Sequence, residues 1–116
     1  MKKRTKAFAL RVIALFRSLP KDEASRIIGR QILRSATSIG ANYRAACRVR
    51  TGREFAAKMR IVCEEADETR YWIELLIESE LMKAIRLQEL HSEATELVGI
   101  FTKALDTTRR KLSPRS

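Results

Sequence analysis

The chain contains little of what interrupts helices and little of what builds catalytic centres. Its 116 residues include 2 Pro, 4 Gly, 2 Cys and 1 His. The scarcity of Pro and Gly, against many Ala, Leu, Arg, Glu and Ile residues, favours helix over sheet. A chain of this length leaves no room for a second core. We therefore expect one all-α domain over residues 1–116, with short frayed tails at 1–3 and 113–116.

Signals for export and for membrane insertion are also missing. No stretch has the roughly 18 to 20 uncharged apolar residues that a membrane span needs. The apolar run at 7–16 contains Arg11 and lacks a small-residue cleavage site after it, so no secretory signal is visible. Cys47 and Cys63 lie at unequal distances from a predicted turn at 51–52, so a disulfide between them is not expected. We interpret both as buried or half-buried side chains of a cytoplasmic protein without membrane contact.

Motifs of enzymes and metal sites are equally scarce. His91 has Gln88 where a Glu-x-x-His di-iron motif would need its Glu, so we interpret it as a surface or rim histidine. The acids at 64–68 spread around a helix instead of converging on a metal. A Ser-x-x-Lys pattern at 18–21 lies at a proline turn without its companion motifs, and no glycine-rich phosphate loop is present. We expect no enzyme, no metal and no cofactor.

Hydrophobic periodicity predicts four helices, at about 1–18, 22–50, 52–82 and 84–111. Pro20 ends the first, and Asp22 can cap the second. Short connections imply an antiparallel up-down-up-down four-helix bundle, in which the short first helix covers only part of the others. Gly40, inside the second helix, either permits a close helix crossing or marks a kink.

The third predicted helix is apolar around most of its circumference near residues 71–77. Its apolar side chains span an arc of about 240° on a helical wheel, whereas packing on one core needs a stripe somewhat over ~100° wide. Two neighbouring helices could cover part of this arc, and a subunit interface would also cover it. Nearby acids could pair with an Arg from a neighbouring helix or subunit. We predict a homo-oligomer with an interface that includes Glu65, Glu68, Trp72 and Leu75.

The charge is sorted along the chain. There are 24 basic and 14 acidic residues, a formal net charge of +10. In an up-down bundle, residues 1–11, 44–60 and 103–116 meet at one end, here called the basic pole, with sixteen Lys or Arg, two acids and a net charge of +14. Arg matches phosphate in bidentate geometry, so this pole is a candidate polyanion site. Alternatively it is a solvated end, with cations that suit the C-termini of two helices.

The predicted nucleic-acid-binding residues are Arg44, Arg48, Arg50, Arg53, Lys58, Arg60, Lys103, Arg109, Arg110 and Lys111. All ten belong to the basic pole. The pole has no RNA-stacking aromatic motif, and the helices do not form a helix-turn-helix pattern, so base-specific recognition is not expected.

One stretch, at 33–79, reads LRSATSIGANYRAACRVRTGREFAAKMRIVCEEADETRYWIELLIES. It has a Ser-x-Gly-Ala-Asn core, a basic turn, a Phe at the entry to the third helix, and an acidic and aromatic run. These motif positions are Ser38, Gly40, Ala41, Asn42, Phe55, Glu64, Glu65, Ala66, Glu68, Tyr71 and Trp72. The pattern resembles the bacterial four-helix-bundle proteins known as 23S rRNA intervening-sequence proteins, and the match extends over nearly the whole chain.

This resemblance implies a small left-handed bundle that assembles as a ring, typically a homopentamer, and it implies no catalytic residues. Some such proteins are encoded in inserts of large-subunit rRNA genes. A related branch, the accessory variability determinants of diversity-generating retroelements, binds reverse transcriptase and nucleic acid through a basic ring. We therefore expect a non-enzymatic, oligomeric accessory protein that binds RNA or another nucleic acid. The alternative is a scaffold that docks an acidic protein such as a reverse transcriptase.

Overall fold

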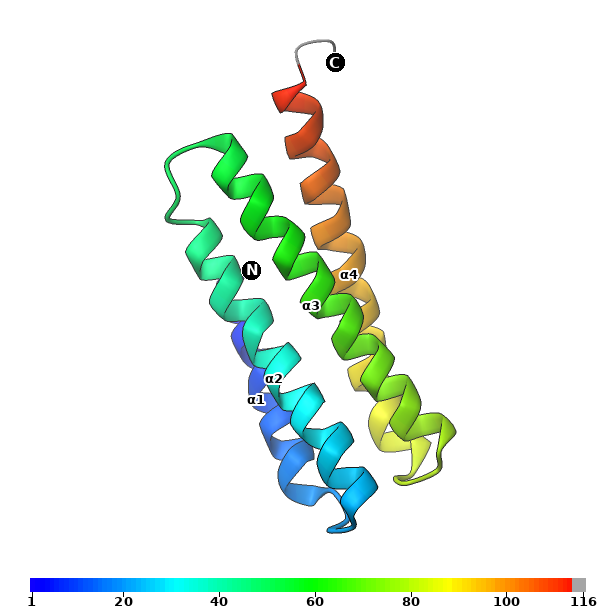
Figure 1. Ribbon diagram of the computed structural model, residues 1–116. Helices are drawn as coiled ribbons and strands as arrows, with labels where there is room; N and C mark the ends of the chain where they lie inside the picture. Colours follow the sequence, from blue (N-terminus) through cyan, green and yellow to red (C-terminus); the bar gives the residue numbers. More distant parts are fainter. Residues whose placement is uncertain (114–116) are drawn as a thin grey trace.

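Four helices account for most of the chain: α1 (Lys2–Ser18), α2 (Glu23–Ala46), α3 (Gly52–Glu78) and α4 (Ala84–Leu112). The computed structural model describes residues 1–113, apart from the side chain of Arg86, and within this range it contains no strand. Consecutive helices run in opposite directions, and the bundle is elongated, with extents of 51 × 22 × 22 Å (Figure 1). The predicted all-α class and the four helices are confirmed.

The helix ends differ from the expectation in three places. α2 ends at Ala46 and α3 at Glu78, each four residues earlier than predicted, so the connections at 47–51 and 79–83 are longer. At the end of α2, the N–H of Arg48 bonds to Ala45 O at 3.1 Å, which tightens the last turn instead of extending the helix. Lys2 begins α1, so residues 2–3 are helical and not frayed. Residues 114–116 of the predicted C-terminal tail lie outside the described range.

Polar side chains cap the two middle helices at their N-termini. Asp22 accepts the Ser25 N–H at 2.9 Å and the Ser25 hydroxyl at 2.8 Å, which confirms the predicted cap of α2. These two donors hold the pKa of Asp22 below its ordinary value. At the start of α3, the Thr51 hydroxyl oxygen accepts the Glu54 N–H at 3.1 Å. The caps therefore fix where the chain turns back on itself.

The core lies along the centre of the bundle and is built from aliphatic side chains at helical spacing. Its fully buried members include Val12, Ile32, Ala36, Ile39, Val62, Ala66, Ile73, Leu76, Leu87, Ala94, Leu97 and Phe101. One hydrogen bond crosses this core, from the Thr69 hydroxyl of α3 to the Ser35 hydroxyl of α2 at 2.8 Å. Both residues are fully buried, so each hydroxyl group gives the other the hydrogen-bond partner that water would otherwise provide.

Glycine residues let α1 lie close to α2. A Cβ atom at Gly40 would stand 3.2 Å from Thr5 Oγ1 and 3.5 Å from Thr5 Cβ. A Cβ atom at Gly29 would stand 2.6 Å from Leu19 Cδ1. α2 remains helical through both positions. The close helix crossing predicted at Gly40 is therefore confirmed, and α1 is the helix that crosses there.

Candidate functional site

The predicted nucleic-acid-binding residues lie at one end of the bundle, on two stretches of the chain, 44–60 and 103–111. The end of α2, the 47–51 connection, the start of α3 and the end of α4 are all found there (Figure 1). Nine of the ten side chains are exposed, and Lys58 is half-buried. The tertiary structure thus brings together segments that are about fifty residues apart in the sequence.

Within the part of the chain that the structure describes, these ten cations have no partner of opposite charge. None of them makes an ion pair or a side-chain hydrogen bond with any residue in the described range 1–113. Three other arginines form ion pairs within residues 1–113: Arg4, in the 1–11 segment of the basic pole, and Arg34 and Arg70, which lie outside the pole. Unpaired like charges on one surface repel one another and raise the local potential, which attracts polyanions.

The N-terminal segment of the basic pole does not extend as far along the bundle axis as the end of α4. Arg4 donates to Glu93 at 2.8 and 2.7 Å and to Glu96 at 3.3 Å, so α1 begins beside the middle of α4. From Glu96 to Leu112, α4 continues for about 24 Å at ~1.5 Å per residue. Residues 1–11 therefore lie beside the end of α2, and the last turns of α4 extend beyond them. α1 has only 17 residues, whereas α4 has 29.

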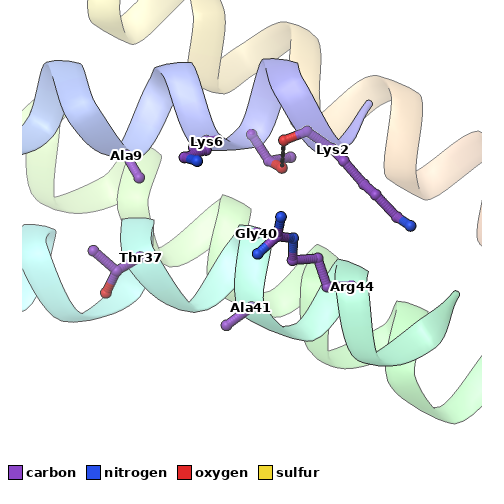
Figure 2. Close-up of a pocket in the computed structure, with 8 residues that line it drawn as sticks. Lys2, Lys6, Ala9, Thr37, Gly40, Ala41 and Arg44 are labelled. Atoms are coloured by element: carbon purple, nitrogen blue, oxygen red, sulfur yellow. Dashed lines mark hydrogen bonds between the residues drawn. The ribbon is translucent and has the colours of Figure 1, made fainter. Parts of the chain in front are cut away.

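A groove separates the start of α1 from the end of α2. Its volume is about 220 Å³, and it is lined by Lys2, Thr5, Lys6, Ala9, Thr37, Gly40, Ala41 and Arg44 (Figure 2). Lys2 and Lys6 were placed in the basic pole by sequence but not among the ten binding residues. Their spacing of four residues on one helix face is the signal that could have singled them out.

The predicted oligomer-interface residues share one side of α3. Arg34 of α2 pairs there with Glu65 at 3.3 Å and also with Glu68. The arginine that the sequence assigned to a neighbouring helix or subunit thus comes from a neighbouring helix of the same chain. Trp72 and Leu75 are half-buried. Both acids therefore have an ion-pair partner within the chain. Of the four predicted interface residues, only Trp72 and Leu75 leave partly exposed apolar surface for a subunit contact.

Trp72 is the unusual member of this group. Its Nε1 is buried and has no hydrogen-bond acceptor among the described residues. Its ring contacts Tyr71 edge-on, with centroids 5.2 Å apart and planes at 68°. Tyr71 is 53% exposed although it is a large aromatic residue. Buried donors are nearly always paired in native proteins, so the Trp72 Nε1–H is an exception among the described residues.

The histidine, the acidic residues and the cysteines form no evident catalytic or metal site among the described residues. His91 is half-buried and shares a 2.8 Å contact with Glu74 of α3, as fits a rim histidine. Within residues 1–113, no group of three or more His, Cys, Asp or Glu side chains could hold a metal ion. Both cysteines are free, and burial raises the pKa of Cys63. Cys47 is exposed, contrary to the expectation.

None of the described helices has a stretch that is both long enough and apolar enough to cross a bilayer.

The fold and the sorted charges define a small four-helix-bundle protein with one cationic end. The pattern of the 23S rRNA-intervening sequence protein family matches residues 1–103, so the chain belongs to that family. A similar solved structure is a protein of unknown function from the S23 ribosomal protein family of Bacteroides thetaiotaomicron. It is 34% identical, covers 90% of this chain and 96% of its own, and superposes with a TM-score of 0.83. No curated protein matches the chain. The resemblance seen in the sequence is confirmed.

Proposed function

We propose that the protein is a non-enzymatic accessory protein that binds nucleic acid, most readily RNA, through its basic pole. The observation that carries this proposal is the group of ten cations at one end of the bundle with no partner in the described chain. Neutralising phosphates releases condensed counterions, so such a surface binds nucleic acid with a strong salt dependence and little sequence preference. The family's link to rRNA insertions is a further reason to choose RNA.

The test compares two charge-reversal variants with a fluorescently labelled RNA hairpin between low and moderate salt. The pole variant carries Arg48→Glu, Arg53→Glu and Arg109→Glu, and the control carries Lys21→Glu, Arg26→Glu and Arg30→Glu near the start of α2. Both lower the net charge of +10 by the same amount. We expect the pole variant to lose at least about tenfold in affinity, because phosphate contacts are removed. For single strands, the slope of log affinity against log salt concentration becomes less steep by ~0.7 for each contact removed. A flat salt response, or equal losses in both variants, would contradict the proposal.

An acidic protein is the alternative ligand for the same cations, and a reverse transcriptase is the kind of partner that the resemblance implies. Carboxylates and phosphates both pair with Arg, so the two readings predict similar variants. They differ in one measurement. Capture of a partner by the wild-type protein that survives nuclease treatment, together with weak binding to purified RNA, would favour the scaffold.

We also propose that the protein assembles as a homo-oligomer, a pentamer by the family resemblance, through the side of α3 that presents Trp72 and Leu75. The unpaired Trp72 Nε1 and the exposed Tyr71 support this choice. A ring would repeat the basic pole and multiply its field. Light scattering should return about five times the chain mass of 13.3 kDa. A mass near that of one chain at working concentration would exclude the assembly.

A further inference from the structure

The cations at the start of α1 divide into two sets. Arg4 faces α4 and is held by Glu93 and Glu96. Lys2 and Lys6 face the other way, line the groove against α2, and make no ion pair within residues 1–113. Of the four cations at the start of α1, Arg4 is neutralised by the protein, whereas Lys2, Lys3 and Lys6 make no ion pair within residues 1–113.

The first turn of α1 is electrostatically unfavourable in the isolated chain. Met1 provides no side-chain cap, and the turn contains no acidic residue. The N-terminus of a helix carries a partial positive charge and unsatisfied N–H groups, which favour anions over cations. Here the turn carries Lys2, Lys3 and Arg4 instead. An anion bound beside it would supply the missing negative charge.

The groove offers such an anion a defined place. Arg44 projects from α2 into the space between the two helices, at a position along α1 between Lys6 and Lys2 (Figure 2). The floor is made of small residues, Ala9, Gly40 and Ala41, and the Gly40 crossing keeps the two helices close. Cations from two separate elements thus border one concave surface.

The remaining polar groups of the groove are already satisfied. The Thr37 hydroxyl donates to Leu33 O at 2.7 Å, and the Thr5 hydroxyl donates to backbone oxygens of the first turn at 3.1 Å. The donors open to a ligand are therefore the two ammonium groups and the guanidinium group. At about 220 Å³ the groove is smaller than the roughly 300–1,000 Å³ of pockets for drug-sized ligands. It suits a compact anion with several acceptor oxygens.

We propose that this groove binds one phosphate group of a nucleic-acid strand between Lys2, Lys6 and Arg44, and that the bound phosphate stabilises the first turn of α1. This inference rests on the proposed function and adds a position to it, because Lys2 and Lys6 are not among the ten predicted nucleic-acid-binding residues. Both anions pair with Arg, but the oxygens of a phosphodiester point in tetrahedral directions toward both sides of the groove, whereas the two oxygens of a carboxylate lie in one plane on one side of its carbon.

The first experiment uses inorganic phosphate alone, followed by amide chemical shifts in ¹⁵N-labelled protein at constant ionic strength. We expect saturable shifts at the Gly40, Ala41 and Lys6 amides and slower hydrogen exchange in the first turn of α1. The groove variant Lys6→Gln/Arg44→Gln should lose at least about tenfold in phosphate affinity, because charge-assisted hydrogen bonds are lost. The matched variant Lys58→Gln/Arg60→Gln should keep these shifts, since it removes two pole cations outside the groove.

The second experiment measures binding of a short uridine RNA by the same two variants. Ala41→Glu, which places a carboxylate on the groove floor, is added, with Ala57→Glu on exposed α3 as its control. We expect the groove changes to lower affinity about tenfold more than their controls. Circular dichroism and the thermal midpoint establish that each variant is folded.

The outcomes separate this inference from the proposed function. Equal losses of RNA affinity in groove and control variants would contradict the phosphate site in the groove and would leave the proposed RNA binding by the basic pole intact. No RNA binding by the wild-type protein would overturn the proposed function and, with it, the nucleic-acid source of the phosphate. In that case shifts with inorganic phosphate would still support an anion site, and their absence would remove it. Saturation of the same amides by oligoglutamate but not by phosphate would assign the groove to an acidic protein.

Discussion

Arg4 in the first turn of α1 donates to both carboxylate oxygens of Glu93 in α4, at 2.8 and 2.7 Å. This two-bond geometry is the strongest that an arginine forms with a carboxylate. It raises the pKa of Arg4 and lowers that of Glu93. The remainder of α1 packs on α2, for example at Gly40 and Gly29. The ion pair therefore ties the open edge of the bundle, where α1 meets α4.

Replacing Glu93 with Gln should loosen α1 in a manner that depends on pH. Because Arg4 lowers the pKa of Glu93 in the folded state, the stabilisation is present above the unfolded pKa of about 4.3 and is lost as pH falls through the folded value. At neutral pH the variant should show faster hydrogen exchange in α1 and a lower thermal midpoint. The difference from wild type should shrink in acid.

Glu96→Gln is the matched control for this prediction. Glu96 makes one longer contact with Arg4, at 3.3 Å, and its side chain is 65% exposed. We expect a much smaller effect on exchange and on the midpoint. Equal effects of the two substitutions, or a Glu93→Gln difference that persists unchanged at low pH, would mean that the ion pair does not hold α1.

The buried hydrogen bond between Ser35 and Thr69 should couple α2 to α3. Each hydroxyl also has a backbone carbonyl within reach, Gln31 O at 2.8 Å for Ser35 and Glu65 O at 2.7 Å for Thr69. Single changes, Ser35→Ala or Thr69→Val, should therefore cost only about 1 kcal/mol of unfolding free energy. The double variant should cost less than their sum, by roughly 0.5–1 kcal/mol. Urea unfolding at fixed protein concentration tests this, and strict additivity would contradict it.

The Thr51 cap should set the stability of the start of α3. Thr51→Ala removes the acceptor of the Glu54 N–H and should cost about 1 kcal/mol. Thr51→Ser keeps the hydroxyl and should be nearly neutral. Both can be compared by urea unfolding. The change lies within the basic pole but alters no charge, so RNA affinity at temperatures where α3 is folded should not change.

Glu80 offers a stabilising substitution. It is exposed, follows the end of α3, and has a φ of 59°, a left-handed conformation that costs a non-glycine residue roughly 1–2 kcal/mol. Glu80→Gly should raise the unfolding free energy by about 0.5–1 kcal/mol, since glycine removes this strain but also gains freedom in the unfolded chain. Glu78→Gly, inside the last turn of α3, should have the opposite sign. A loss of stability in Glu80→Gly would show that the turn is not strained.

Much of the fold follows from local patterns. Pro20 and Asp22 place the first turn because one ends a helix and the other caps the next. Gly40 marks a close crossing because a Cβ atom there would touch Thr5. The ends of α2 and α3 were predicted less well. Helical propensity continues past Ala46 and Glu78, and the point at which the chain leaves the helix depends on turn contacts that a linear pattern does not contain.

The candidate site divides in a similar way. Cations on three segments were assigned to one end from helix count and direction alone, and Figure 1 shows the end of α2, the start of α3 and the end of α4 there. The sequence did not decide whether the arginine that pairs with Glu65 comes from a neighbouring helix or from another subunit. A helical wheel shows which side of a helix a residue lies on, but not which element packs against that side. Cys47 was expected to be at least half-buried and is exposed, because the helical pattern does not show which neighbouring helix covers a given residue.

The sequence by itself determined the class, the helix order and the excess of positive charge, because these depend on composition, on periodicity and on turn residues next to one another in the chain. Only the tertiary structure decided the level at which α1 begins, and therefore that Arg4 is neutralised by Glu93 while Lys2 and Lys6 border a groove with Arg44. That level is set by packing between helices far apart in sequence, at Thr5 against Gly40 and at Arg4 against α4. Contacts of this kind depend on the three-dimensional register of the helices, which local sequence does not fix.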